Sequence, residues 1–274
     1  MKKIATIQDF SCVGKCSLTV ALPIISAMGI ECCGIPTAVL SNHTGFPSFY
    51  SRDLTEDIPK ICGQLNTHGM TYDAISTGYI ASISQMGFIE EFIREFRAKN
   101  TLIFVDPVMG DNGRLYSQIT GHYAEKMRRL CAHADIIAPN LTEACLLLNR
   151  DYTDSPDGGE LCEMLKGLSE LGAKTVVITG VARKNEIGSA AFDGKDFYEH
   201  YCEKYNVSCS GTGDIFASVL LGAILRERSF DRSLDIAVKF SSEAARLTAA
   251  DTDRRFYGVN FEQAIPYLIK LLED

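Results

Sequence analysis

Hydrophobic residues occur along this chain in two kinds of segment: short continuous runs, and longer stretches with apolar positions three or four residues apart. The short runs predict buried strands, and they cover residues 2–8, 31–40, 72–77, 101–105, 135–138 and 174–179. The longer stretches predict helices, and they cover residues 15–28, 57–65, 84–98, 123–131, 160–171, 215–225, 233–250 and 261–272. Strands and helices therefore alternate, which is typical of a mainly parallel sheet covered by helices on both faces.

The remaining segments are consistent with one α/β domain spanning residues 1–274. Residues 188–192 and 197–201 predict a hairpin. Pro23 lies inside the first predicted helix and is expected to kink it or to mark its boundary. The loop-rich segment 151–159 is too short to link two domains, so we predict no domain boundary.

The composition is that of an ordinary globular protein, with 46% hydrophobic and 23% charged residues among 274. The formal net charge of −8 disfavours a nucleic-acid surface, which needs a basic stripe to neutralise phosphates. No apolar run reaches the length of a membrane span, and the segment after Met1 lacks a signal-peptide core. We therefore expect a cytoplasmic protein without nucleic-acid or membrane partners, in which an anionic substrate would have to come with a metal ion.

The sequence Gly211-Thr212-Gly213-Asp214 stands directly before the predicted helix at 215–225. Glycines accept a positive φ and allow close approach, so successive backbone N–H groups can point at one oxyanion. The helix adds the positive end of its dipole at the same place. The pattern predicts an anion cradle, although taken alone it also fits an ordinary loop in which Asp214 caps the helix.

Carboxylates gather where two central strands are predicted to end. Asp106 and Asp111 follow the strand at 101–105, and Glu143 follows the next strand along the chain. Because ligands bind at the carboxyl ends of parallel strands, an acidic edge near an anion cradle indicates a Mg²⁺–nucleotide site. Glu143 has a second interpretation, because Asn140 is a natural N-cap and Glu143 would complete its capping box. The local pattern favours neither interpretation.

Five motifs, in order along the chain, resemble those of the pyridoxal/pyridoxine (vitamin B6) kinases of the ribokinase-like superfamily. They are Asn-His-Thr-Gly at 42–45, Thr-Gly-Tyr at 77–79, Asp-Pro-Val-x-Gly-Asp at 106–111, Pro-Asn-x-x-Glu at 139–143 and Gly-Thr-Gly-Asp at 211–214. The resemblance covers nearly the whole chain, and five motifs in the same order argue against a chance match. It implies a three-layer α/β/α ribokinase-like fold with a mainly parallel central sheet.

The resemblance also implies roles for individual residues. The general base would be Asp214, and the anion hole for the transferred phosphoryl group would be formed by Gly211, Thr212 and Gly213. Mg²⁺ and a monovalent cation such as K⁺ would be organised by Asp106, Asp111 and Glu143. The phosphates of ATP would be contacted by Asn140, Thr179 and Thr212. The pyridine ring would be bordered by Leu40, Thr44 and Tyr79, with His43 close by and Asp9 where relatives often have serine.

The expected activity is ATP-dependent phosphorylation of the 5′-hydroxymethyl group of pyridoxal, pyridoxine or pyridoxamine by a homodimer, the common state in the family. A carboxylate at Asp9 would favour a donating substituent, so pyridoxine and pyridoxamine should compete well with pyridoxal; alternatively Asp9 only caps a turn. Two other functions stay open. A hydroxymethylpyrimidine kinase shares the cradle, although the Asn-His-Thr-Gly segment argues against it, and a non-catalytic nucleotide or vitamin sensor would need no base at Asp214. Cys209, beside the cradle, is interpreted as a packing residue.

Overall fold

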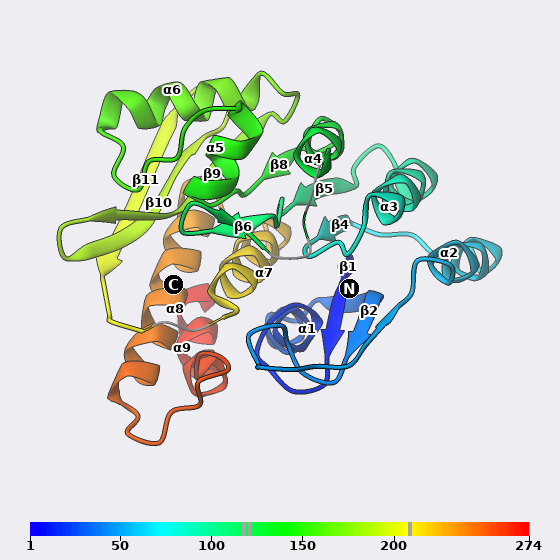
Figure 1. Cartoon of the computed structure of the whole chain (residues 1–274), viewed down its shortest axis with the longest axis horizontal. Coiled ribbons are helices and arrows are strands. Elements are labelled where there is room, and N and C mark those ends of the chain that lie inside the picture. The colour runs from blue at the N-terminus through cyan, green and yellow to red at the C-terminus, as the bar shows by residue number, and fades with distance from the viewer. Residues whose placement is uncertain (117–118, 120–121, 208–209, 274) are drawn as a thin grey trace.

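The structure is a computed structural model that describes residues 1–116, 119, 122–207 and 210–273, so Cys209 lies outside the described residues. Within this part of the chain, nine strands form one sheet in the order β11-β10-β9-β8-β5-β4-β1-β2-β3 (Figure 1). The strands are β1 (Lys3–Ser11), β2 (Glu31–Leu40), β3 (Ser51–Asp53), β4 (Ala74–Thr77), β5 (Leu102–Val105), β8 (Ile136–Ile137), β9 (Thr175–Arg183), β10 (Glu186–Phe192) and β11 (Phe197–Glu203).

The centre of the sheet is parallel, and its edges are antiparallel. Strands β9, β8, β5, β4, β1 and β2 run in the same direction. The edge strand β3 pairs antiparallel with β2, and the predicted hairpin of β10 and β11 continues the other edge. The predicted mainly parallel sheet is therefore confirmed.

Helices cover both faces of this sheet, as Figure 1 shows. One face packs against α2 (Ile58–Thr67), α3 (Ile83–Phe96), α4 (Tyr123–Cys131), α5 (Leu141–Leu148) and α6 (Gly158–Ser169). The other face packs against α1 (Leu18–Ala27), α7 (Thr212–Leu225), α8 (Phe230–Ala250) and α9 (Phe261–Glu273). Alternate residues of the buried strands serve the two cores, since Ile103 and Val105 belong to the first and Phe104 to the second. The predicted three-layer α/β/α architecture is confirmed.

Three local features differ from the expectations drawn from the sequence. Strand β9 does not end at Thr179 but continues through Gly180, whose φ is 70°, to Arg183, because it pairs with β10 over this length. Of the two alternatives for Pro23, a kink or a boundary, the boundary is wrong, because Pro23 lies inside α1. The short strand β3 and a small hairpin of β6 (Gly110–Asp111) and β7 (Arg114–Leu115) were not predicted.

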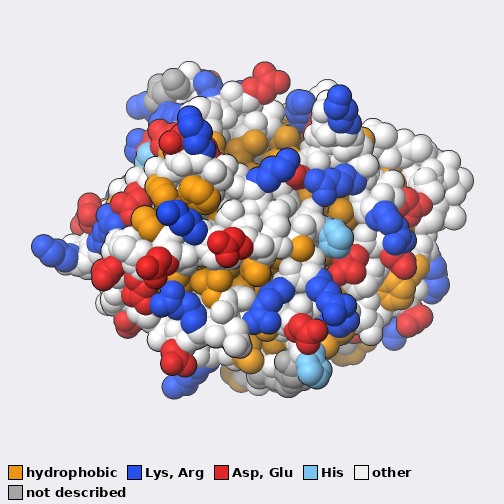
Figure 2. Space-filling view, turned by 90° about the horizontal axis from the view of Figure 1, so that it is seen from above, with side chains coloured by type: hydrophobic (Ala, Val, Ile, Leu, Met, Phe, Trp, Pro, Cys, Tyr) orange, Lys and Arg blue, Asp and Glu red, His pale blue; other side chains and the backbone are white. Residues whose placement is uncertain are grey.

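The surface carries charges of both signs. Figure 2 shows Lys and Arg side chains interspersed with Asp and Glu over the face seen from above. Among the helices of the described residues, none combines the length and the hydrophobicity needed to cross a membrane.

Candidate active site

The predicted cradle is built where α7 begins. Gly211 is the N-cap residue in a left-handed conformation with φ 91°, and the N–H of Ile215 donates to its carbonyl at 3.0 Å. A side chain at Gly211 would also clash, because a Cβ there would lie 1.9 Å from the Lys15 carbonyl oxygen. Thr212 and Gly213 are exposed, and no heavy atom lies within 4 Å of a Cβ built on Gly213. The first N–H groups of α7 therefore border open space that an anion can enter.

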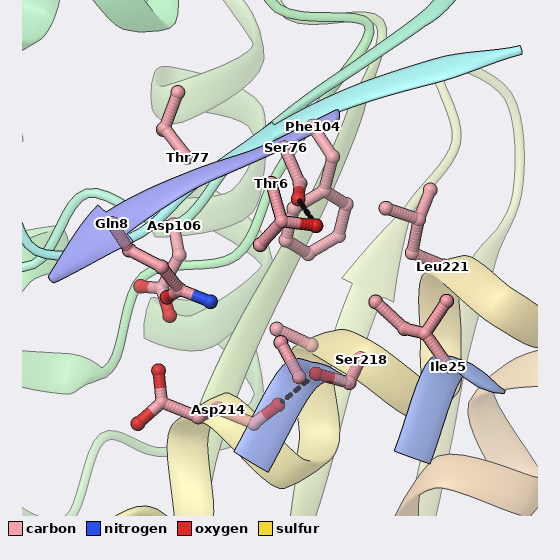
Figure 3. A pocket seen from close by; sticks show the side chains of 12 residues that line it. Thr6, Gln8, Ile25, Ser76, Thr77, Phe104, Asp106, Asp214, Ser218 and Leu221 are labelled. Carbon is pink, nitrogen blue, oxygen red and sulfur yellow. Dashed lines mark hydrogen bonds between the residues drawn. The ribbon is translucent and has the colours of Figure 1, made fainter. Parts of the chain in front are cut away.

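Asp106 comes from the sheet and Asp214 from a helix that covers one of its faces, and both line one cavity. Asp106 follows β5, and Asp214 lies in the first turn of α7. Figure 3 shows their carboxylates pointing toward a common space beside the side chain of Gln8. The sequence pattern predicted Gln8 only as the last residue of the first strand, although a polar residue at the end of a buried strand is a signal for such a position.

The Asp214 carboxyl is tuned toward proton acceptance near neutral pH. Burial raises its pKa to about 7, against the stabilising backbone N–H of Ser17, and the negative charge of Asp9 raises it further. The Ser218 hydroxyl donates to the Asp214 carbonyl at 2.6 Å and fixes the backbone of this turn. A carboxyl with a pKa near the working pH is suited to act as a general base. Ser17 was not predicted, since its contribution is a backbone N–H that carries no residue signature.

Glu143 completes the capping box that the sequence predicted. The Glu143 N–H donates to Asn140 Oδ1 at 3.0 Å, and the Asn140 N–H donates to Glu143 Oε2 at 2.9 Å. Glu143 Oε1 also accepts the Met109 N–H at 3.0 Å. Burial raises the pKa of Glu143 to about 8, and the pKa of Asp106 is raised by burial and then by the charges of Glu143 and Asp214. The capping interpretation is confirmed, and a role of Glu143 toward a metal stays a prediction.

These residues fit a hydrated Mg²⁺ held beside phosphate rather than a cage of protein ligands. The described residues contain no group of three or more His, Cys, Asp or Glu side chains placed to hold a metal by themselves. The Thr77 hydroxyl, which lines the same cavity as Asp106 and Asp214, is buried without a hydrogen-bond partner. A hydrated cation would neutralise the negative charge that gathers here. One of its waters could form a hydrogen bond with the buried Thr77 hydroxyl.

Asp111 and two of the three predicted phosphate contacts, Asn140 and Thr179, lie around the start of α5, whereas Thr212 begins α7. The exposed Asp111 carboxylate accepts the backbone and side-chain N–H groups of Asn112, both at 2.9 Å, within the β6–β7 hairpin. The side chain of Asn140 donates to the Gly110 carbonyl at 2.8 Å and ties this hairpin to α5. Asn140 pairs with Thr179 in an isolated parallel bridge. The structure thus brings Asn140 and Thr179 together, as a shared phosphate site requires.

The residues predicted to border the pyridine ring differ in how exposed they are. Leu40 is buried at the end of β2, and Thr44 is exposed in the following loop. Tyr79 is partly buried, and burial raises its pKa to about 12, with the charges of Asp9 and Asp53 adding to the effect. These side chains can provide an apolar wall with a few polar groups, which is the usual lining of a small-molecule site.

Asp9 lies at a bulge of β1, where the pairing with β2 changes register between Gln8 and Phe10. Its side chain is 5% exposed and accepts hydrogen bonds from the hydroxyls of Ser17 and of Ser11, the latter at 3.0 Å. Burial raises the pKa of this carboxyl, and the serine hydroxyls oppose that shift. Both carboxylate oxygens therefore have partners within the protein, and contact with substrate stays a prediction.

His43 is also engaged by the protein. Its ring is 6% exposed, Nδ1 accepts the Gly45 N–H at 2.9 Å, and Nε2 lies 3.1 Å from the carbonyl oxygen of Tyr257. The sequence predicted a place beside the pyridine ring and missed Tyr257, which stands in the polar segment before α9. A hydrogen bond from His43 to a substrate would have to replace one of these contacts.

Known proteins are similar to this chain over nearly its whole length. The profile of a family described as phosphomethylpyrimidine kinase matches residues 22–260. A crystal structure of a putative phosphomethylpyrimidine kinase from Bacteroides thetaiotaomicron is similar with a TM-score of 0.95 and 38% identity, over 98% of this chain and 94% of that chain. An orthorhombic form under the same description, with pyridoxal, gives a TM-score of 0.93 at 38% identity, over 98% and 96%.

Two pyridoxal kinases are also similar over most of their length. The crystal structure from Lactobacillus plantarum has a TM-score of 0.91 and 30% identity, over 100% of this chain and 98% of that chain. The pyridoxal kinase of Arabidopsis thaliana is 28% identical over 286 residues, which cover 99% of this chain and 90% of the relative.

Proposed function

The chain belongs to the phosphomethylpyrimidine kinase family, and we propose that it transfers the γ-phosphoryl group of ATP to the 5′-hydroxymethyl group of a B6 vitamer: pyridoxal, pyridoxine or pyridoxamine. The observation that carries this proposal is the Asp214 carboxylate, with its pKa near 7, at the mouth of an open helix N-terminus and facing Asp106. The pyridoxal in the orthorhombic Bacteroides structure and the two related pyridoxal kinases support this substrate class.

In this proposal Asp214 takes the proton of the substrate hydroxyl as its oxygen attacks the γ-phosphorus. The N–H of Ser17 orients the carboxylate toward the hydroxyl. The backbone N–H groups of Thr212 and Gly213, with the dipole of α7, hold the transferred phosphoryl oxygens as the bond to ADP breaks. The protonated Asp214 then returns its proton to solvent.

The cation and nucleotide sites follow the same edge of the sheet. Mg²⁺ would neutralise charge on the phosphate oxygens. Asp106 would hold it, with Glu143 and Asp111 acting through water. A monovalent cation such as K⁺, organised by the same three carboxylates, is carried over from the family resemblance. Asn140 and Thr179 would border the ATP phosphates, as the isolated bridge between Asn140 and this residue of β9 supports.

Hydroxymethylpyrimidine is the second candidate substrate. The matching family and the Bacteroides structures are described as phosphomethylpyrimidine kinase, which supports a substrate with a pyrimidine ring. Both substrates present a hydroxymethyl group on a flat nitrogen ring, so the wall formed by Leu40, Thr44 and Tyr79 must distinguish them. A non-catalytic sensor is disfavoured, because a sensor gains nothing from a base beside the anion cradle.

We also propose, on the family resemblance, that residues 1–274 act as one catalytic domain, as a homodimer and in the cytoplasm, where ATP is supplied. Light scattering coupled to size exclusion would measure the oligomeric state. A single peak at twice the 30.1 kDa chain mass is expected, and a monomer at assay concentration would contradict the dimer.

The activity is tested by a coupled ADP-release assay with Mg-ATP and each of the three vitamers, with hydroxymethylpyrimidine in parallel. We expect ADP release that depends on vitamer and on Mg²⁺. ADP release with hydroxymethylpyrimidine and with none of the vitamers would show that hydroxymethylpyrimidine is the substrate. ATP binding without release for any of the four would support the sensor.

A further inference from the structure

The carbonyl oxygen of Tyr257 joins two loops from the other end of the chain. It accepts the backbone N–H of Lys15 at 3.2 Å and lies 3.1 Å from His43 Nε2. Because His43 Nδ1 accepts the Gly45 N–H at 2.9 Å, that nitrogen carries no proton. A neutral imidazole then has its single proton on Nε2, which donates to the Tyr257 carbonyl.

The His43 ring has no room to turn away from this arrangement. A Cβ built on Gly14 would lie 2.4 Å from the ring carbon Cδ2, and one built on Gly45 would lie 2.6 Å from Cε1. Phe46 packs edge-on against the ring at 5.1 Å and stacks on Tyr257 at 5.6 Å. The ring is therefore held between two glycines, and the Phe46 ring packs against both the His43 ring and the Tyr257 ring.

Of the two loops that meet at Tyr257, one borders the expected substrate site and the other holds the proposed general base. Residues 41–47 include Thr44, at the substrate end. Residues 12–17 include Ser17, whose N–H holds the Asp214 carboxylate. The same loop touches the cradle, since a Cβ on Gly211 would lie 1.9 Å from the Lys15 carbonyl oxygen. The Lys15 ammonium is anchored on α9 by Glu262 at 2.8 Å.

We propose that His43 is a positioning residue for phosphoryl transfer, acting through its Nε2–H bond to the Tyr257 carbonyl. The two loops are already joined by backbone hydrogen bonds, from the His43 N–H to the Val13 carbonyl at 3.0 Å and from the Val13 N–H to the Ser41 carbonyl at 3.2 Å. The side-chain bond clamps both loops to Tyr257 as well, and so fixes the distance between the substrate hydroxyl and its base. The inference rests on the proposed kinase function. It assigns His43 a task that needs no contact with the pyridine ring, and it brings residues 256–258 into the active-site framework.

Two substitutions separate the two ring nitrogens. His43→Gln places an amide N–H near the Nε2 position, so it can still donate to Tyr257, but it loses the acceptor for Gly45. His43→Asn places an amide oxygen near the Nδ1 position, so it can still accept from Gly45, but it cannot reach Tyr257. His68→Asn, at the exposed C-terminal end of α2, is the matched control.

We expect the kcat of His43→Asn to fall roughly 10- to 100-fold, as for a small misplacement of a reacting group, with the KM for ATP nearly unchanged. His43→Gln should keep at least about tenfold more kcat than His43→Asn, while both melt at similar temperatures below wild type; these figures are the size of effect a positioning role implies. His68→Asn should behave as wild type. Equal losses for Gln and Asn, or the reverse order, would overturn the inference.

A second measurement does not depend on activity. Long-range ¹H–¹⁵N correlation spectra of the wild-type protein report which imidazole nitrogen carries the proton. We expect the Nε2–H tautomer, and an Nδ1–H tautomer would contradict the clamp even if every vitamer were phosphorylated. Conversely, an Nε2–H ring in a protein that releases no ADP would leave the clamp standing and remove the proposed function.

Discussion

Glu143 and Asn140 each satisfy the other's backbone N–H at the start of α5, at 2.9 and 3.0 Å. The same carboxylate accepts the N–H of Met109, so it also fixes the loop that follows Asp106. The sequence predicted Glu143 either as a helix cap or as part of a metal site. The Glu143 carboxyl does cap α5, and it also lies beside the other residues of the predicted metal site. Separating these contributions by substitution is the first test of the site.

Glu143→Gln should lower both stability and Mg²⁺ use. The amide keeps one acceptor oxygen but turns an NH₂ toward a backbone N–H, which should lower the free energy of unfolding by about 1–3 kcal/mol. If Glu143 orders the waters around Mg²⁺, the half-saturating Mg²⁺ concentration should rise about tenfold. Denaturant melts and Mg²⁺ titrations of turnover measure the two effects.

Asp157→Ala provides the control for capping alone. Asp157 caps α6 by accepting the Glu160 N–H at 2.9 Å. Its loss should cost ~1 kcal/mol and leave the Mg²⁺ dependence unchanged. If Glu143→Gln behaved in the same way, Glu143 would be a cap and nothing more.

Asp214→Asn should remove the base while keeping the nucleotide site. Positioned general bases contribute about 10²–10⁴-fold to the rate, or roughly 3–5 kcal/mol, so kcat should fall by that order with the KM for ATP nearly retained. Ser218→Ala, which removes the 2.6 Å hydrogen bond to the Asp214 carbonyl, should cost far less. Turnover of Asp214→Asn close to wild type would exclude Asp214 from proton transfer.

The same substitution should stabilise the free protein at alkaline pH. The pKa of Asp214 rises from 3.8 to about 7 on folding, so its contribution to stability is fully present below pH 4 and is lost as the pH rises through 7. Asparagine removes this loss and should raise the free energy of unfolding at pH 8 by on the order of 4 kcal/mol. Near pH 4 the difference should vanish.

Thermal melts at the two pH values, without nucleotide or metal, provide the measurement. Asp253→Asn, on an exposed loop, should leave the melting temperature unchanged at both. An equal destabilisation by Asp214→Asn at pH 4 and at pH 8 would contradict a raised pKa of Asp214.

Asp9→Ser tests which task Asp9 performs. Both carboxylate oxygens already accept serine hydroxyls, and Ser17 in turn holds Asp214. We therefore expect kcat to fall by a similar factor for all three vitamers, with their specificity ratios preserved. The sequence left both tasks of Asp9 open, and a selective loss for pyridoxamine would place Asp9 in the ring pocket.

The architecture could be predicted because buried strands and amphipathic helices leave a pattern in the side chains. The strand at residues 31–40 and the helix at 123–131 agree with the structure at both ends. Strand β3 could not be predicted, since Ser51-Arg52-Asp53 is polar and exposed. The extension of β9 past Gly180 depends on its antiparallel partner β10, which a local pattern does not include.

At the site, side-chain chemistry was predictable and backbone chemistry was not. The motifs indicate carboxylate chemistry by their residue types, and they contain Asp106, Glu143 and Asp214. Ser17 and Tyr257 contribute a backbone N–H and a carbonyl, which every non-proline residue possesses. Only the fold, which brings Tyr257 against His43, gives those groups a function.

The Lys15 side chain also contacts Asn260, 245 positions along the chain, at 3.3 Å. During synthesis the early strands can pair while this contact waits for residues near 260 to leave the ribosome. Contacts of such sequence separation cost the most loop entropy and form late. Kinase activity should therefore emerge at the end of translation, so a stalled nascent chain that ends before residue 250 would carry Asp106, Glu143 and Asp214 and still be inactive.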